Sequence, residues 1–149
     1  MTDFFVVARR SDARFYDFTS LHPTRKLVRT IALEGGRAVR MRMAVQARPD
    51  YARRQPAWQV VKGGYSMVDV SLFTSVPLTV EESDLVAEFS LESGSRHFAV
   101  LDYSDERTAP DFAAIDRWQE ITEASGTSGT CSTITADRIR RSLGAAPSR

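Results

Sequence analysis

The side chains of this sequence that could take part in chemistry are scattered, and none belongs to a known catalytic motif. There is no GxSxG, phosphate-binding loop, HExxH or CxxC pattern, each of which sets a nucleophile, a glycine cradle or metal ligands at a fixed spacing. His22 and His97 stand in different contexts, and His97, among apolar residues, suits a partly buried polar residue better than a general base. Cys131 has no histidine or asparagine beside it in the sequence, which disfavours a thiol nucleophile.

The acidic residues offer two further possibilities, and neither has the spacing that its chemistry needs. Glu81 and Glu82 are adjacent, so on a strand they point to opposite faces. Glycoside hydrolysis instead needs two carboxyl groups that face each other across a gap of about 5–10 Å. Asp102, Asp105 and Glu106 form a small cluster, but a calcium loop needs more ligands at set positions. We therefore predict no catalytic residue, no metal and no cofactor.

Aromatic side chains remain as candidates for ligand binding. Tyr51, Trp58 and Tyr65 lie close together in the sequence, and exposed Tyr and Trp rings can stack on sugar rings. Aromatic residues in strands and adjoining loops are more often part of a core, so a sugar site requires at least two of the three to be exposed on one surface. A second group of aromatic residues near the N-terminus comprises Phe4, Phe5, Phe15, Tyr16 and Phe18.

Composition excludes several classes of protein. The chain has 149 residues, of which 42% are hydrophobic and 26% charged, and this is typical of one globular domain. A net charge of +1 disfavours a general binder of nucleic acid or of an anionic membrane. No apolar run reaches the ~20 residues of a membrane-spanning helix. The start MTDFFVVARR lacks the features of a signal peptide, and the single cysteine fits a reducing compartment, so we expect a cytoplasmic location.

Alternating hydrophobicity predicts a mostly-β fold. Residues 38–48 alternate most clearly and predict a half-buried antiparallel strand with a solvated polar face. The inward set is Val39, Met41, Met43, Val45 and Ala47, and the outward set is Arg40, Arg42, Gln46 and Arg48. Further strands are expected at 25–33, 58–62, 65–74, 84–93 and 96–104, with glycine turns at 34–37 and 63–64. Strands at this spacing predict an antiparallel β-sandwich.

The pattern changes after residue 107. In 108–125, apolar residues recur at helical spacing, Thr108 and Asp111 have the spacing of a capping box, and Pro110 is expected in the first turn. We therefore expect a helix here, followed by a loop, a short second helix over 135–144 and a loose tail. The predicted organisation is a partial β-sandwich domain at 1–107, a linker-type helix at 108–125, and a loop, short helix and flexible tail at 126–149.

Four short motifs follow one another along the chain: Thr2-Asp3-Phe4, Leu27-Val28-Arg29-Thr30-Ile31, Met41-Arg42-Met43 and Pro49-Asp50-Tyr51-Ala52-Arg53. Their order and spacing resemble the N-terminal β-sandwich domain of bacterial family-15 glycoside hydrolases, the glucoamylase-like and trehalase-like enzymes. The helix with Ile115 and Trp118 is similar to the linker helix of that family, and 137–143 is similar to the start of its helical catalytic barrel.

The departures from the family limit what the resemblance implies. The early strands of the family's sandwich are expected to be missing, and the chain is expected to stop where the barrel with its two catalytic glutamates would begin. The resemblance therefore implies a fold and no activity. In the whole enzymes, loops of the sandwich border the mouth of the active site, and the equivalent loop here is expected at 49–56.

Three hypotheses of function follow. The leading one is a non-catalytic accessory domain, truncated or stand-alone, that packs against a glycoside hydrolase catalytic domain or a second copy of itself. Truncation predicts an exposed apolar face or a free edge strand at the place of the missing partner. The second is a carbohydrate-binding module that recognises α-glucosides through Tyr51, Trp58 and Tyr65. The third is a free-standing enzyme built on Asp/Glu pairs or Cys131.

Overall fold

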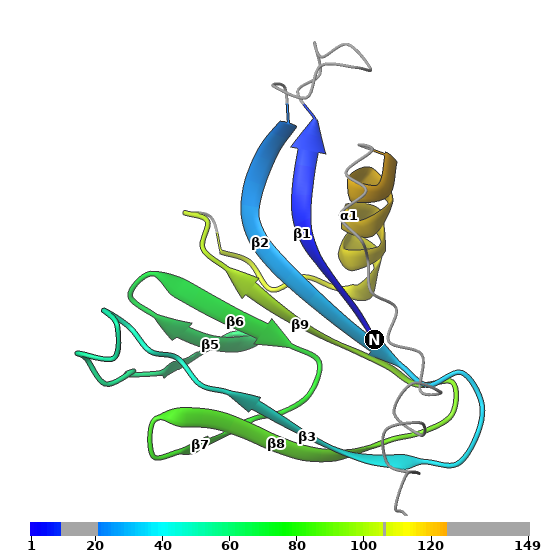
Figure 1. Cartoon of the computed structure of the whole chain (residues 1–149), viewed down its shortest axis with the longest axis horizontal. Coiled ribbons are helices and arrows are strands. Elements are labelled where there is room, and N and C mark those ends of the chain that lie inside the picture. Colours follow the sequence, from blue (N-terminus) through cyan, green and yellow to red (C-terminus); the bar gives the residue numbers. More distant parts are fainter. Residues whose placement is uncertain (10–20, 106, 125–149) are drawn as a thin grey trace, which may run out of the picture.

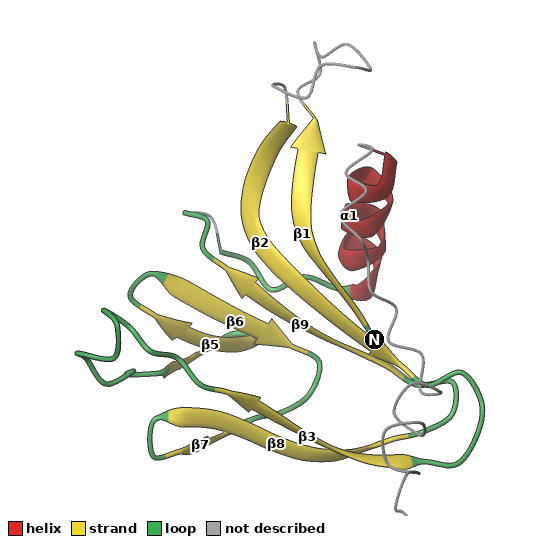
Figure 2. Cartoon of the chain, in the orientation of Figure 1, coloured by secondary structure: helices red, strands yellow, loops and turns green. Residues whose placement is uncertain are grey.

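A computed structural model describes residues 1–9, 21–105 and 107–124, which form two antiparallel sheets and one helix (Figure 1). The large sheet contains, in spatial order, β1 (Thr2–Arg9), β2 (Leu21–Ala32), β9 (Arg96–Asp102), β6 (Val70–Thr74), β5 (Gly64–Met67) and β4 (Gln59–Val61). The small sheet contains β3 (Val39–Val45), β8 (Asp84–Leu91) and β7 (Thr79–Glu81). Together with α1 (Phe112–Ala124), these elements confirm the predicted mostly-β, antiparallel sandwich with a C-terminal helix (Figure 2).

Several predictions fall on residues outside the described ranges. They concern the second helix over 135–144, the tail to 149, and the side chains of Phe15, Tyr16, Phe18, His22, Glu106 and Cys131.

Two hydrophobic clusters cover the two faces of the large sheet. The first lies between the sheet and α1, and its buried members are Val6, Val28, Phe73, Phe98, Val100 and Ile115. The second lies between the two sheets, and its buried members are Leu72, Val76, Leu78, Leu85 and Ala87. Because side chains alternate along a strand, β6 and β9 each contribute to both clusters. The large sheet is therefore the middle layer of the molecule.

Strand β3 keeps the alternation that its sequence predicts. Met41, Met43 and Val45 are half-buried, and Arg40 and Arg42 are exposed. Val39, which was predicted to face inward, is 45% exposed at the start of the strand. The strand pairs with β8 along its whole length. The prediction of a half-buried strand with a solvated arginine face is confirmed.

The single strand predicted over 65–74 is wrong. This segment is a hairpin of β5 and β6 that turns at Val68 and Asp69. Val68 is 89% exposed and does not share a core face with Val70 and Leu72. The alternation runs across the turn, so it cannot distinguish one long strand from two short ones. Two strands, β1 and β7, were also missed, because neither alternates over enough residues.

The start of α1 differs from the predicted capping box. Oδ1 of Asp111 accepts a hydrogen bond of 2.7 Å from the backbone N–H of Ala114, so Asp111 is the N-cap. Pro110 therefore precedes the cap and is not in the first turn. Ile115 is fully buried against the large sheet, and Trp118 packs beside it.

One row of side chains crosses the whole large sheet on the face that the small sheet covers. Cross-strand pairing aligns six residues in the order Phe5, Leu27, Leu101, Leu72, Tyr65 and Val60. Leu72, in the middle, is 1% exposed, whereas Phe5 and Val60, at the two ends, are 69% and 79% exposed. Since cross-strand partners share a face, the row shows that the small sheet covers only the middle of the large one.

A buried ion pair joins β2 to the end of β9. The ammonium of Lys26 donates to the carboxylate of Asp102, whose side chain is 1% exposed. Ser104 donates to the same carboxylate from its hydroxyl at 2.6 Å and its backbone N–H at 2.9 Å. Burial by itself raises the pKa of Asp102, but the hydrogen bonds from Lys26 and Ser104 outweigh it and hold that pKa below its usual range. The Lys26 ammonium also lies 5.7 Å from the ring centroid of Trp118 on α1.

We expect Asp102→Asn to lower the free energy of unfolding by about 3 kcal/mol, because it leaves the Lys26 ammonium largely buried without its counter-charge. Equilibrium urea unfolding measures the loss. Asp3→Asn is the matched control: it breaks the ion pair with Arg29, in which the two side chains are 41% and 50% exposed, and should cost no more than about 1 kcal/mol. Equal losses in the two variants would contradict this account of the Lys26 pair.

The same ion pair predicts a loss of stability in acid. Since the folded state holds the pKa of Asp102 below the unfolded value of about 3.9, the ionised carboxylate stabilises the fold above that pH. The contribution falls as the pH drops through the lower, folded pKa, where folded Asp102 also takes up a proton. The difference in unfolding free energy between wild type and Asp102→Asn should therefore shrink steadily below about pH 4. A difference that stays constant to pH 2 would oppose this role of the carboxylate.

Candidate functional site

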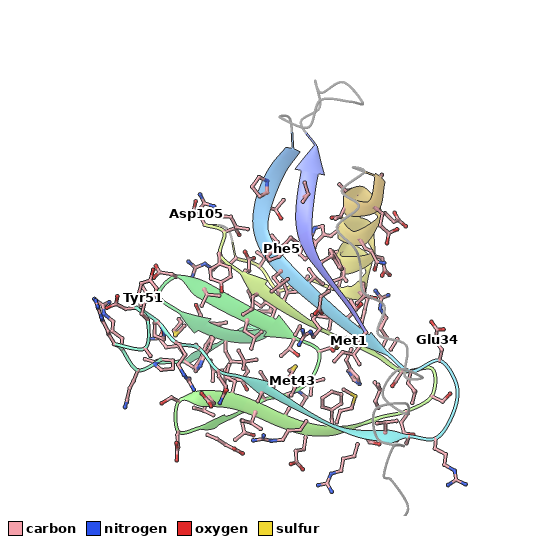
Figure 3. All side chains as sticks on the ribbon, viewed as in Figure 1. Met1, Phe5, Glu34, Met43, Tyr51 and Asp105 are labelled. Atoms are coloured by element: carbon pink, nitrogen blue, oxygen red, sulfur yellow. The ribbon has the colours of Figure 1, made fainter. Side chains whose placement is uncertain are left out.

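The three aromatic residues predicted to bind sugar occupy different environments. Tyr51 is 94% exposed at the tip of the loop that follows β3 (Figure 3). Trp58 and Tyr65 are half-buried and pack against the cluster between the sheets. The hydroxyl of Tyr65 donates to the backbone carbonyl of Leu78. The structure thus brings Trp58 and Tyr65 to one hydrophobic cluster and leaves Tyr51 apart from them.

Trp58 also lines a pocket of about 470 Å³ at the end of the sandwich. This loop pocket lies between residues 45–58 and the turn of the β5–β6 hairpin. Polar and charged residues line it from three segments of the chain, and they are Gln46, Arg48, Asp50, Arg54, Gln55, Asp69 and Tyr103. Apolar residues that include Val45, Met67, Val70 and Leu101 supply most of its remaining lining.

The loop beside the pocket has an unusual backbone. Asp50, Tyr51 and Ala52 have φ values of 51°, 54° and 67°, so three consecutive residues other than glycine adopt the left-handed conformation. Each such residue costs roughly 1–2 kcal/mol relative to the right-handed form. The backbone N–H of Arg53 donates to the carbonyl of Asp50 at 3.0 Å, which closes the turn. Strain of this kind is concentrated at functional sites, so the turn supports a role for the loop.

Most of the charge near the pocket is paired. Arg48 lies 3.2 Å from Oδ1 of Asp84, and Gln46 donates to Oδ2 of the same carboxylate at 2.6 Å. The hydrogen bond from Gln46 and then that from Arg48 hold the pKa of Asp84 below its usual range. Arg54 lies 3.9 Å from Asp50, its neighbour four residues earlier. These pairs leave the pocket without a strong field of either sign.

The indole nitrogen of Trp58 is the exception to this pairing. Its Nε1 is buried and has no hydrogen-bond acceptor among the residues that the structure describes. A buried donor normally has a partner, because an unmade hydrogen bond costs about 1–3 kcal/mol. An apolar pocket with a few polar groups in its lining is suited to bind a small molecule.

Among the described side chains considered for catalysis, His97 is held by contacts within the fold. The hydroxyl of Ser75 accepts from the backbone N–H of Phe98 at 2.9 Å and lies 3.2 Å from Nδ1 of His97. The imidazole ring also meets Phe89 edge-on, with a centroid distance of 5.2 Å. His97 is thus a half-buried residue between the sheets, in agreement with its sequence context.

The acidic candidates do not form a facing pair. Glu81 ends β7 and Glu82 begins the turn into β8, and both are exposed. Asp102 is held by Lys26 and Ser104, while Asp105 is exposed. Within the described ranges, no three His, Cys, Asp or Glu residues are grouped to hold a metal ion.

Sequence reasoning did not identify Asp69 and Tyr103 as residues of a site. Asp69 lies in a turn inside the segment 65–74 that was predicted to be one strand. Tyr103 lies near the end of the strand predicted over 96–104, and no motif surrounds it in the sequence. Only the packing of the β5–β6 turn beside the end of β9 brings them to Trp58. The loop 49–56, which the family resemblance singles out, does border the pocket.

The fold and the site together define an antiparallel β-sandwich with a loop-bordered pocket at one end. Comparisons with protein-family models, curated proteins and solved structures found no match to this chain. Among the described helical residues, none form a helix long and apolar enough to cross a membrane. The likeness to the family-15 N-terminal domain therefore stays a prediction.

We expect Tyr65→Phe to lower the free energy of unfolding by about 1–2 kcal/mol, because it leaves the buried Leu78 carbonyl without its donor. Tyr51→Phe is the same chemical change at an exposed ring and should alter the unfolding free energy by no more than about 0.5 kcal/mol. Urea unfolding of both variants measures the difference. A neutral Tyr65→Phe would show that this hydroxyl is not held by the core.

Proposed function

We propose that this chain is a non-catalytic accessory domain whose large sheet packs against another polypeptide. The observation that carries the proposal is the uncovered end of the row across the large sheet. Phe5 is 69% exposed, and its cross-strand neighbour Leu27 lines a cavity of about 260 Å³ with Met43 of the small sheet. Apolar side chains that stay exposed beside a sheet edge are typical of protein–protein contact surfaces.

The sequence resemblance supports the choice of partner. It favours a carbohydrate-metabolism context and a glycoside hydrolase catalytic domain of the family-15 kind as the polypeptide that covers Phe5. A second copy of the chain is the alternative partner. The bonds of His97 and Asp102 within the fold support a structural role for both. We propose a cytoplasmic location, on the basis of the single cysteine.

We expect Phe5→Asp to abolish the association of this chain with its partner, because it places a charge in the apolar contact. Sedimentation velocity of the chain, alone and mixed with a purified family-15 catalytic barrel, measures the association. Tyr51→Asp is the control, since it makes the same kind of change at an exposed aromatic ring at the other surface. A thermal melt verifies that both variants fold.

Two results would contradict the proposed contact at the large sheet. One is a chain that stays monomeric both alone and with the barrel. The other is a complex that Phe5→Asp leaves intact while Tyr51→Asp disrupts it, because the contact would then lie at the loop.

A second candidate function is an α-glucoside-binding module, and the loop pocket with Trp58 and Tyr103 specifically favours it. A ligand of the native state raises stability by mass action, about 2.7 kcal/mol at a hundred times its dissociation constant. If the accessory role is correct, the thermal melt followed by far-UV circular dichroism should not change with excess malto-oligosaccharide or trehalose. A rise in melting temperature that Tyr103→Ala removes would support the binding module instead.

A further inference from the structure

We propose that the free edge of β3 accepts one extended strand from the partner, and that this strand alternates acidic and apolar side chains. The added strand would extend the small sheet over the uncovered strip formed by Phe5 and Leu27. This inference rests on the proposed accessory role and specifies the chemistry of the partner.

The first argument is the state of the β3 edge. β3 pairs with β8 from Val39 to Val45, and in the described part of the chain no strand pairs with its other side. Its backbone has an unbroken register, with no proline, glycine or bulge. Natural edge strands are usually protected by such devices or by inward-pointing charges. β3 has only outward arginines, so its free N–H and C=O groups can pair with another strand.

The second argument is the space beside that edge. Strands in a sheet lie about 4.8 Å apart, so the next strand beyond β3 would lie over the part of the large sheet that the small sheet leaves open. This part is the cavity that Met43 borders on one side and Leu27, Asp3 and Arg29 border on the other. Inward side chains of the added strand would fill the cavity and cover Phe5. Those that face Leu27 and Phe5 must therefore be apolar.

The third argument is the charge on the outward face. The guanidinium of Arg40 donates to Glu88 at 2.7 Å. Arg42 stands directly opposite Glu88 in the strand register, yet no ion pair involves Arg42 among the residues described. The outward face of β3 thus presents Arg42, whose cross-strand partner Glu88 is bonded to Arg40 instead. Opposite charges across strands stabilise a sheet and like charges destabilise it, so the outward residues of the added strand are acidic.

A second copy of β3 fits this edge poorly. Antiparallel pairing of two β3 strands would place both large sheets on the same side of the joined small sheets. Phe5 of β1 is 69% exposed on the face that the small sheet covers, so the β1–β2 strip of each copy would extend into the space needed by the other. A single strand from a different polypeptide meets no such obstruction.

The test uses a capped peptide of alternating Glu and Val as the probe. Amide chemical shifts and hydrogen exchange of the whole chain report where the peptide binds. We expect protection of β3 amides that do not bond to β8, with shifts at Phe5 and Leu27. A peptide of the same composition, with the Glu and Val residues in two blocks, should not bind, and one that alternates Lys and Val should bind more weakly.

Charge reversal provides the decisive comparison. Arg42→Glu should weaken binding of the Glu/Val peptide about tenfold and strengthen that of the Lys/Val peptide, because it exchanges an attractive cross-strand pair for a repulsive one. Arg117→Glu, the same change at an exposed position on α1, should alter neither. A thermal melt of each variant verifies folding.

Strand addition is overturned if the Glu/Val peptide protects no β3 amide, or if the two charge reversals have equal effects. These results are separate from those for the accessory role. Association with the barrel that depends on Phe5 but leaves the β3 amides unprotected would retain the accessory role and reject strand addition. Peptide binding at β3 without any Phe5-dependent association would support strand addition and reject the barrel as the partner.

Discussion

The whole fold depends on the need to bury both faces of the large sheet. Strand β9 contributes side chains to the hydrophobic cluster on each face. Val100 of β9 is fully buried on the face that α1 covers, and Leu101 packs on the opposite face against the small sheet. At the end of the same strand, Asp102 binds Lys26 of β2, which in turn lies near Trp118 of α1. One strand and its terminal ion pair thus connect all three layers.

The small sheet is too narrow to meet this requirement everywhere, and its size explains the surfaces that remain. It contributes three strands against six, so the row across the large sheet emerges into solvent at Phe5 and at Val60. The two exposed ends of the row differ in how much unpaired backbone lies beside them. Val60 lies on β4, an edge strand of only three residues, which offers little backbone for pairing. Leu27, the cross-strand neighbour of Phe5, lines a cavity beside the seven-residue edge strand β3, so apolar area and unpaired backbone occur together there.

The loop pocket and the uncovered strip lie on different parts of the sandwich and suit different ligands. The pocket lies beside the strained turn that begins at Asp50, and Trp58 forms part of its lining, so it suits a small molecule. The strip lies beside the unpaired edge of β3, so it suits a polypeptide strand. Trp58 and Tyr65 are half-buried against the core, so Tyr51 is the exposed aromatic ring of the predicted three, and a single ring gives limited stacking area.

The sequence by itself determined the features that depend on near neighbours. The period of two in β3, the glycine turns and the apolar spacing of α1 are local, because they follow from side-chain direction and backbone freedom. Tertiary structure alone decided the rest. Three features depend on which segments meet across the sheets. They are the turn at Val68, the pairing of Glu88 with Arg40 instead of Arg42, and the exposure of Phe5. Alternation shows which side chains share a face, but how far a second layer covers that face is set by contacts between residues distant in sequence.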